Sequence, residues 1–349
     1  MASSVWPDEI RSVEELEDLL SRPTAAAGRA LARLQGDILI LGAGGKMGPT
    51  LARMARRAAD AAGVPRRIIG VSRFAGRQAL CTQLLTHGVE TVAGDLLDPE
   101  FVASLPDVPN VIFMAGMKFG ATGNEPLTWA ENAYLPSLVC RKFLRSRIAA
   151  FSTGNIYGNV VAAAAGGSVE TDVPNPCGEY AMSCLGRERI FEYFSRTFAI
   201  PTAIIRLNYA IDMRYGVLVD LAQKVYAGLP IDLAMGYANV IWQGDAAALT
   251  LCALADAAVP PLVLNVTGPE RLSVRDLAER FGRLMGRPVR FTGAEAADAL
   301  LSNPAEAVRR YGPPAVGIDR MVQWIARWIA AGGPTLGKPT HFEVRDGKF

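Results

Sequence analysis

The chain has 349 residues, of which 50% are hydrophobic and 20% charged, as is typical of a globular protein with a full core. Its formal net charge of +2 is too small to indicate a protein that binds nucleic acid or a membrane surface. Five scattered cysteines without a C-x-x-C pair, and only two histidines, argue against a metal site and indicate reduced thiols in a cytoplasmic protein.

The start of the chain predicts a helical N-terminal extension over residues 1–35. The stretch "MASSVWPDEIRSVEELEDLL" is acidic and patterned like a helix, and it lacks the apolar segment of a signal peptide. Amphipathic patterning continues to residue 34. No apolar run in the chain reaches the ~18 residues of a membrane span, so no spanning helix is expected.

Short apolar runs then alternate with helix-like stretches. The runs predicted as strands cover residues 36–42, 66–72, 89–95, 110–116, 147–154, 200–208 and 261–268. A long helix is predicted near residues 126–146. This alternation predicts an α/β fold with a doubly wound parallel Rossmann sheet that helices cover on both faces.

The domain organisation is predicted from the segments in which the alternation of strands and helices is interrupted. Residues 36–208 plus 240–268 are predicted to form the dinucleotide-binding domain. Residues 209–239 plus 269–335, rich in Pro and Gly, are predicted to form a smaller C-terminal substrate lobe over the carboxyl ends of the strands. The polar C-terminal tail, 336–349, is expected to be loosely held.

The stretch "LGAGGKMG" (41–48) predicts a dinucleotide site. Gly42, Gly45 and Gly48 recur at three-residue spacing between a strand and a helix. Such glycines make the tight turn, let backbone N–H groups approach a pyrophosphate, and let the helix pack closely on the strand. The helix N-terminus then faces the phosphates, with Lys46 and Met47 in the same loop.

The second strand ends in "GVSRF", which favours NADP over NAD. No acidic residue is present to bind a ribose 2′-OH, and Arg73, after Ser72, stands where a 2′-phosphate would lie. Lys46 could add a second positive charge there. The alternative is that Arg73 is an ordinary surface residue and NAD binds.

Two further segments complete the predicted cofactor site, to which Tyr180 is also assigned. Asp95 and Leu96 follow the third strand and are candidates for the adenine edge, although Asp95 could equally be a capping residue. Ala115 and Gly116 follow the fourth strand.

An ordered set of motifs resembles a known family. The motifs are "GAGGKMG", "GDLLD", "FSTGNIYG", "PCGEYAMSCLGRE", "IIRLN", "QGDAA" and "LNVTGPERLSVRDL". Over roughly residues 36–330, the chain resembles the extended short-chain dehydrogenases/reductases, the group that includes the NAD-dependent epimerases and dehydratases. The resemblance implies a nicotinamide cofactor, a small-molecule substrate, and a homodimer that pairs through the helix bearing the catalytic Tyr.

In that family a strand-end hydroxyl and a Y-x-x-x-K helix form the catalytic site. The resemblance assigns the hydroxyl to Thr153 and the phenol to Tyr180, but Cys184 stands in place of the Lys. A free phenol titrates near ~10 and needs a neighbouring cation to act as a base at neutral pH. A thiol cannot supply that charge, and Cys184 is interpreted as a small packing residue; the alternative is an activated nucleophile, which would need a basic neighbour.

A second cation could replace the missing ammonium. We expect Lys118, after the fourth strand, to reach the Tyr180 region; the alternative is a surface lysine. Arg187 and Arg189 follow on the Tyr180 helix and are expected on the helix surface or against the lobe.

The substrate motifs of the family are altered. Ala238 stands where nucleotide-sugar enzymes carry a diphosphate-binding Arg, and "RLNYAID", with Asn208, lacks the usual Gly-Pro. Gly154 and Asn155 follow Thr153 where the dehydratases carry an acidic pair, which argues against dehydration. The predicted substrate contacts are Asn155, Asn208 and Arg214, the last being either an anion clamp or an ordinary ion pair.

Three hypotheses follow. The first is an NAD(P)-dependent oxidoreductase or epimerase for a small polyhydroxy or carboxylate substrate, with Tyr180 and Thr153 at the reacting oxygen. The second is an NAD(P)-binding sensor with an altered active site. The third is a nucleotide-sugar epimerase.

Overall fold

A computed structural model describes residues 6–118, 120–162 and 166–348. Residues 1–5 of the predicted extension, residue 119, residues 163–165 and the last residue of the tail lie outside the described residues.

The core of the fold is a seven-stranded sheet in which every neighbouring pair is parallel, in the order β12-β7-β5-β4-β1-β2-β3. Its strands are β1 (Ile38–Leu41), β2 (Ile68–Ser72), β3 (Glu90–Ala93), β4 (Asn110–Phe113), β5 (Arg147–Thr153), β7 (Thr202–Leu207) and β12 (Leu262–Val266). All seven predicted strands are present, and the doubly wound Rossmann fold is confirmed. The order reverses between β1 and β4, the switch point at which such sheets bind ligands.

The helices alternate with these strands along the chain. They are α1 (Val13–Leu20), α2 (Ala25–Arg33), α3 (Gly48–Ala61), α4 (Gln78–Thr86), α5 (Pro99–Ser104), α6 (Glu125–Trp129), α7 (Leu135–Lys142), α8 (Gly178–Phe198), α9 (Val217–Tyr226), α10 (Gln243–Ala255), α11 (Val274–Met285), α12 (Ala305–Tyr311) and α13 (Ile318–Ala330). The long helix predicted near 126–146 is instead α6 and α7, joined by a π-helical turn at Ala130–Tyr134. None of these described helices combines the length and apolar character needed to cross a membrane.

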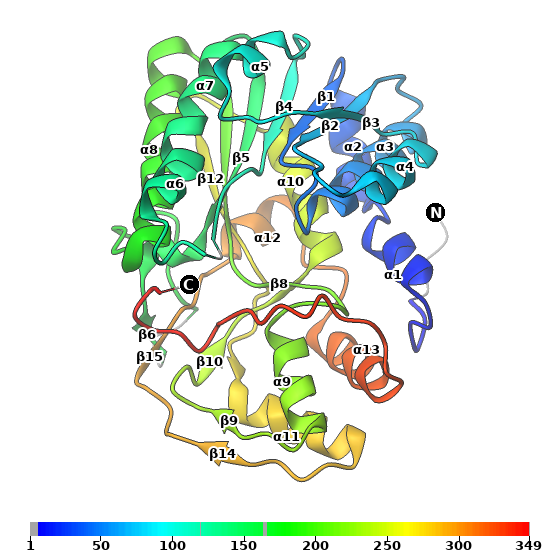
Figure 1. Cartoon of the computed structure of the whole chain (residues 1–349), viewed down its shortest axis with the longest axis vertical. Coiled ribbons are helices and arrows are strands. Elements are labelled where there is room, and N and C mark those ends of the chain that lie inside the picture. The colour runs from blue at the N-terminus through cyan, green and yellow to red at the C-terminus, as the bar shows by residue number, and fades with distance from the viewer. Residues whose placement is uncertain (1–5, 119, 163–165, 349) are drawn as a thin grey trace.

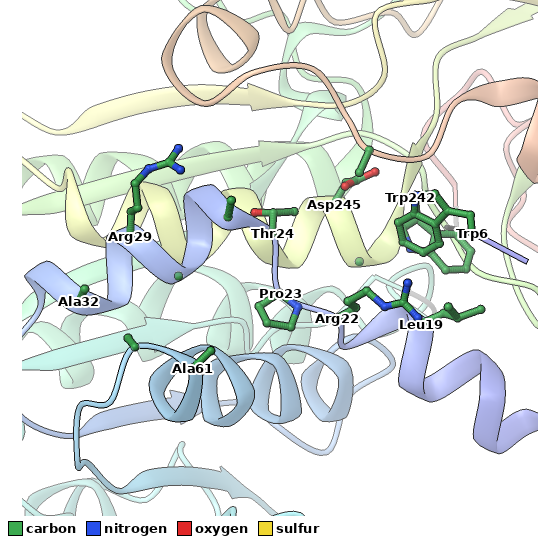
Figure 2. Close-up of a pocket in the computed structure, with 15 residues that line it drawn as sticks. Trp6, Leu19, Arg22, Pro23, Thr24, Arg29, Ala32, Ala61, Trp242 and Asp245 are labelled. Atoms are coloured by element: carbon green, nitrogen blue, oxygen red, sulfur yellow. The ribbon is translucent and has the colours of Figure 1, made fainter. Parts of the chain in front are cut away.

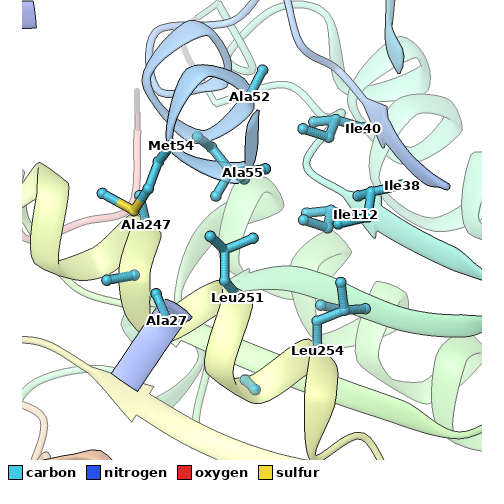
Figure 3. Packing of buried hydrophobic residues seen from close by; sticks show 14 of the residues in the cluster. Ala27, Ile38, Ile40, Ala52, Met54, Ala55, Ile112, Ala247, Leu251 and Leu254 are labelled. Atoms are coloured by element: carbon cyan, nitrogen blue, oxygen red, sulfur yellow. The ribbon is translucent and has the colours of Figure 1, made fainter. Parts of the chain in front are cut away.

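Helices cover both faces of the sheet (Figure 1). On one face, small residues of α2, α3 and α10 allow these helices to pack closely on β1 and β4. Figure 3 shows this packing with Ala27, Ile38, Ile40, Ala52, Met54, Ala55, Ile112, Ala247, Leu251 and Leu254. On the other face α5, α7 and α8 bury a second apolar cluster. The near-continuous apolar strands follow from this double burial.

The smaller lobe lies beyond the carboxyl ends of the strands (Figure 1). Helices α9, α11 and α13 share one apolar cluster, which also includes Leu16, Leu19 and Leu20 of α1. The short strands there and nearby are β6 (Val160–Val161), β8 (Ala210–Ile211), β9 (Ile231–Asp232), β10 (Tyr237–Ala238), β11 (Ile241–Trp242), β13 (Leu272–Ser273), β14 (Phe291–Thr292) and β15 (Asp298–Ala299). Because α2 packs on the sheet and α1 on the lobe, the N-terminal extension contacts both parts.

The described part of the C-terminal tail is not loosely held, contrary to expectation. It runs across the front of the molecule between sheet and lobe (Figure 1). Phe342 is buried, Thr340 donates from its N and Oγ1 to Asp220 Oδ2 at 2.8 and 2.5 Å, and Arg345 pairs with Asp298. Specific polar anchors and one buried ring offset the entropy of ordering this polar segment.

Candidate active site

A cavity of about 480 Å³ lies at the carboxyl ends of β1, β2, β3 and β4. Of the predicted cofactor residues it brings together Gly42, Gly45, Ser72, Arg73, Asp95, Leu96, Ala115 and Gly116. We call it the nucleotide pocket. Lys46 and Met47 do not line it, and Gly48 begins α3 beside it.

Two glycines explain why the chain approaches itself so closely here. Gly42 has φ +95°, and a Cβ on it would lie 2.6 Å from the backbone N of Ala115. A Cβ on Gly48 would collide with the backbone of Ala43, where α3 begins. The first turn of α3 has no acidic residue, so its N-terminus can face an anion. These features fit a dinucleotide with its pyrophosphate at the loop.

Two arginines that follow β2 line the nucleotide pocket. Arg73 is exposed and lies 3.5 Å from Glu131 Oε1 in an ion pair. Arg77 donates from Nη1 to the carbonyl of Gly44 at 2.5 Å and also lines the pocket. Arg77 is not among the predicted cofactor residues, although its position five residues after the end of β2 was a signal in the sequence.

A second, smaller cavity of about 150 Å³ lies between the sheet and the lobe; we call it the catalytic pocket. Of the predicted site residues it brings together Lys46, Met47, Lys118, Thr153, Asn155, Tyr180 and Asn208. Thr340 of the tail is part of its lining. Arg214 does not line it.

The predicted catalytic hydroxyls meet in this pocket. Thr153 ends β5 and is buried; its Oγ1 accepts from Asn155 N at 3.2 Å and from Asn155 Nδ2 at 2.9 Å. The hydroxyls of Thr153 and Tyr180 also form a hydrogen bond. Asn208 is tied to Asn239 Oδ1 at 2.9 Å and is held in the wall.

Burial dominates the electrostatics of the Tyr180 helix. It raises the pKa of the Tyr180 phenol above its ordinary value, while the Arg187 charge and the Thr153 hydrogen bond oppose the shift. It also raises the pKa of the Cys184 thiol. Cys184 is fully buried in a small cluster with Ile156 and Tyr157. At neutral pH both groups are therefore protonated.

The expectation that Arg187 lies on the helix surface or against the lobe is wrong. Its side chain is 6% exposed, and it donates to Phe151 O at 3.0 Å and to the backbone and side-chain oxygens of Asn132. It lies two helical turns beyond Tyr180, on the same face. Arg189, by contrast, is exposed and pairs with Glu192.

Asn132, in the π-helical turn, holds the loop that carries Lys118. Its side chain accepts from Met117 N and donates to Met117 O, both at 2.9 Å. This holds the loop after β4, and the Lys118 Nζ lies 5.8 Å from the centre of the Tyr180 ring. Burial lowers the pKa of Lys118 to about 8.

Lys46 and Arg214 do not lie where a phosphate-binding and an anion-binding role would place them. Lys46 does not line the nucleotide pocket with Arg73; its side chain leaves the loop toward the lobe, and its Nζ lies 3.7 Å from the centre of the Tyr215 ring in the catalytic pocket. Of the two alternatives for Arg214, an anion clamp or an ordinary ion pair, the structure shows the ion pair. It pairs with Asp212 and with Glu17 of α1, each at 3.0 Å, so its charge is already compensated.

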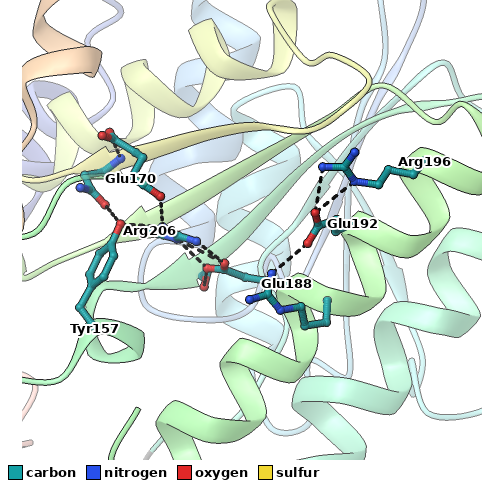
Figure 4. Close-up of polar contacts among 9 residues, drawn as sticks. Tyr157, Glu170, Glu188, Glu192, Arg196 and Arg206 are labelled. Atoms are coloured by element: carbon teal, nitrogen blue, oxygen red, sulfur yellow. Dashed lines mark hydrogen bonds and ion pairs between the residues drawn. The ribbon is translucent and has the colours of Figure 1, made fainter. Parts of the chain in front are cut away.

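A buried polar network packs against β5, the strand that ends at Thr153 (Figure 4). Ser152 donates to Glu188 Oε1 at 2.5 Å, and Glu188 pairs with Arg206 at 2.8 Å. Arg206 Nη1 donates to Tyr157 Oη at 2.6 Å, and Tyr157 donates to Asn265 Oδ1 at 2.8 Å. The network holds Ser152, the neighbour of Thr153, through α8, β7 and β12.

Neither pocket is the largest cavity described. A cavity of about 620 Å³ lies between α1, α2, α3 and α10, with Trp6, Arg22 and Trp242 around it (Figure 2). None of the predicted site residues lines it. Within residues 6–118, 120–162 and 166–348, no group of His, Cys, Asp and Glu side chains could hold a metal ion.

Solved structures resemble this fold at low sequence identity. The dTDP-glucose 4,6-dehydratase DesIV from Streptomyces venezuelae, determined with NAD, has a TM-score of 0.71 at 17% identity, covering 84% of this chain and 97% of that chain. The UDP-glucuronic acid 4-epimerase of Bacillus cereus, determined with UDP-glucuronic acid and NAD, has a TM-score of 0.70 at 17% identity, with 84% and 99% covered. MoeE5, determined with UDP-glucose and NAD, has a TM-score of 0.67 at 20% identity, with 85% and 99% covered.

Comparison with curated proteins gives no match. The model of the family described as "NAD dependent epimerase/dehydratase family" matches residues 38–232, from the first strand through the Tyr180 helix into the lobe. Since this match spans more than half of the 349 residues, the chain belongs to the NAD-dependent epimerase/dehydratase family.

Proposed function

We propose that the protein is an NAD(P)-dependent oxidoreductase or epimerase that acts on a small polyhydroxylated substrate in the catalytic pocket. One observation carries the proposal. Thr153 and Tyr180 share this pocket with Met47 of the glycine loop and with two lysines, at the switch-point edge of the sheet where the nucleotide pocket also lies. The Thr153 hydroxyl, the Tyr180 phenol and the glycine loop therefore border the same small pocket.

In this proposal each side chain has a distinct part. A bound nicotinamide supplies or accepts the hydride. As the phenol, its form at neutral pH, Tyr180 donates a proton to the substrate oxygen; in the oxidative direction it removes one as the phenolate. Thr153 orients that oxygen through its hydroxyl, which Asn155 holds in place.

Arg187 takes over the electrostatic role of the missing Lys, which is to lower the pKa of the catalytic phenol. Its buried guanidinium lowers the pKa of Tyr180, opposing the effect of burial. Its hydrogen-bond partners in the described structure are neutral oxygens of Phe151 and Asn132, and the carboxylate of Glu131 interacts with its charge without an ion pair being formed. Lys118, 5.8 Å from the ring centre, is the second cation.

Several features favour a small substrate over a nucleotide sugar. The catalytic pocket, at about 150 Å³, is below the roughly 300–1,000 Å³ typical of sites for drug-sized ligands. Ala238, in the position of a diphosphate-binding Arg, is fully buried. The tail contributes Thr340 to the wall and is anchored through Arg345. The likeness to nucleotide-sugar enzymes keeps their substrates as the alternative.

The direct test begins with the purified protein. Denaturing it should release bound NAD(P)(H), or the apoprotein should bind added nucleotide. Free sugars, sugar acids and nucleotide sugars are then offered in turn, and reduced nicotinamide and altered products are measured. The absence of nucleotide binding in every form would contradict the proposed function.

We further propose that NADP is preferred. Arg73 and Arg77 supply two cations beside Ser72, and β2 ends without an acid to bind a 2′-OH. Replacing both arginines by Ala should weaken NADPH binding roughly 10- to 100-fold, because hydrogen bonds to charged groups contribute about 1.5–3 kcal/mol. NADH binding should change little. Fluorescence titration of both nucleotides checks this, and equal losses for NADH and NADPH would contradict it.

The second hypothesis, a nucleotide-binding sensor, is favoured by one observation: Cys184 stands where the family carries an ammonium, and its thiol is neutral. Tight nucleotide binding without turnover would support it.

We also propose a homodimer. Tyr134, Met182, Tyr193 and Phe198, on or beside α7 and α8, are exposed apolar side chains that pairing of these helices would cover. Sedimentation analysis tests the assembly.

A further inference from the structure

The charged groups that line the catalytic pocket are all cations. Lys46 and Lys118 contribute ammonium groups, and no carboxylate lines the pocket among the described residues. The acids nearest to Lys46 have other partners: Asp212 pairs with Arg214, and Asp220 accepts from Thr340. The pocket is therefore suited to a ligand with negative charge.

Lys46 presents its ammonium at the lobe side of this pocket. Its Nζ donates to Ala210 O at a long 3.4 Å and lies 3.7 Å from the Tyr215 ring centre. Ala210 O is its one hydrogen-bond acceptor within the described part of the chain. An ammonium has three N–H donors, so donors remain for a ligand.

The surroundings of Lys46 make its protonation depend on whether an anion is bound in the pocket. Burial lowers its pKa to about 7; the charges of Lys118 and Arg214 lower it further, and those of Asp212 and Asp220 raise it. Tyr215 lies against its Nζ. An anion in the pocket would favour the protonated form, as would the phosphates of a cofactor at the same loop.

We propose that Lys46 binds the carboxylate of a small polyhydroxylated acid whose reacting hydroxyl lies at Thr153 and Tyr180. This rests on the proposed function, because the same pocket must hold the reacting carbon. The two hydroxyls and Lys118 mark the reacting end of the pocket. Lys46, which lies against Tyr215, marks the end that holds the carboxylate, and the pocket volume limits the ligand to a small acid.

The test compares matched acidic and neutral ligands on the NADP-loaded protein. D-Glucuronate, D-galacturonate and D-gluconate are paired with D-glucose, D-galactose and D-glucitol, and binding is measured by calorimetry. At least one acid should bind better than its neutral counterpart. Lys46→Met should weaken binding of that acid about 10- to 100-fold and leave the neutral ligand unchanged. Lys142→Met, which removes a lysine of α7 outside the pocket, should change neither.

The pH dependence supplies a second readout. The ligand carboxylate is ionised throughout pH 5–9, so its affinity should fall as Lys46 loses its proton, above a midpoint at or above about pH 7. Lys46→Arg keeps the charge at all these pH values and should flatten the fall. Lys118→Met should leave this step in place, because Lys118 is assigned to the reacting end.

Three outcomes would overturn the inference. One is that no acid is preferred over its neutral counterpart. Another is that the preference survives in Lys46→Met. The third is that Lys46→Met weakens NADPH binding alone, which would make Lys46 a cofactor contact. Failure of the proposed function is distinct: no nucleotide would bind, and acid binding that depends on Lys46 could still be measured on the apoprotein.

Discussion

Replacing Tyr180 by Phe is expected to lower turnover about 10²–10⁴-fold, the usual contribution of a positioned general acid or base. The ring remains, so the packing around Ile156 and Cys184 should persist. The hydroxyl is lost, and with it the hydrogen bonds to Thr153 and Cys184. Steady-state kinetics at saturating cofactor measure the effect, and affinity for NADPH should be nearly unchanged.

Tyr193→Phe is the matched control for this substitution. Tyr193 lies on the same helix, is 56% exposed, and faces away from the catalytic pocket. Turnover by this variant should equal that of the wild type. Equal activity of Tyr180→Phe and Tyr193→Phe would show that Tyr180 is not the catalytic phenol.

The raised pKa of Tyr180 also fixes the direction of the pH dependence. Burial holds the phenol protonated at neutral pH, so the group is ready to donate a proton when a carbonyl is reduced. Oxidation of an alcohol needs the phenolate, whose fraction grows with pH. The oxidative rate should therefore rise as pH rises above neutrality, and this rise should vanish in Tyr180→Phe.

The second large effect is on stability. Glu188→Gln should destabilise the protein by about 3–5 kcal/mol, because it leaves Arg206 charged and unpaired in the interior. Both side chains of this pair are less than 10% exposed, and Ser152 and Tyr157 bond to the same network. Chemical denaturation monitored by circular dichroism measures the change.

Glu192→Gln is the matched control for the ion pair (Figure 4). Glu192 lies one helical turn further along α8 and pairs with Arg189 and Arg196, both largely exposed. Surface pairs contribute about 0–1 kcal/mol, so this variant should be nearly as stable as the wild type. The prediction for Glu188 is wrong if the two variants unfold at the same denaturant concentration.

The sequence predicts most of the sheet because each strand is a short apolar run with turn residues on both sides. "GDILILG" gives β1, and the glycines after it give the sharp turn into α3. Thr153 and Tyr180 could be predicted as a pair because each occupies a family motif. Their approach in one pocket depends only on the order of strands and helices.

The sequence does not predict where long side chains point. Lys46 follows a cofactor glycine, but its side chain turns to the lobe and Tyr215. Arg187 looks like a surface residue by its charge, yet Asn132 and Phe151 supply enough oxygens to bury it. The tail is polar, and only tertiary contacts such as Thr340 with Asp220 hold it in place. Each of these depends on partners far away in the chain.

Rapid mixing of the NADP-loaded protein with a sugar acid tests the central claim most directly, with the absorbance of reduced nicotinamide as the signal. A dehydrogenase gives a lasting rise and an epimerase a transient one, so both forms of the proposed function predict a signal, and Tyr180→Phe should abolish it. If the wild type binds NADP tightly but gives no reduced nicotinamide with any sugar, sugar acid or nucleotide sugar, the proposed enzymatic function is contradicted and the protein is a nucleotide-binding sensor.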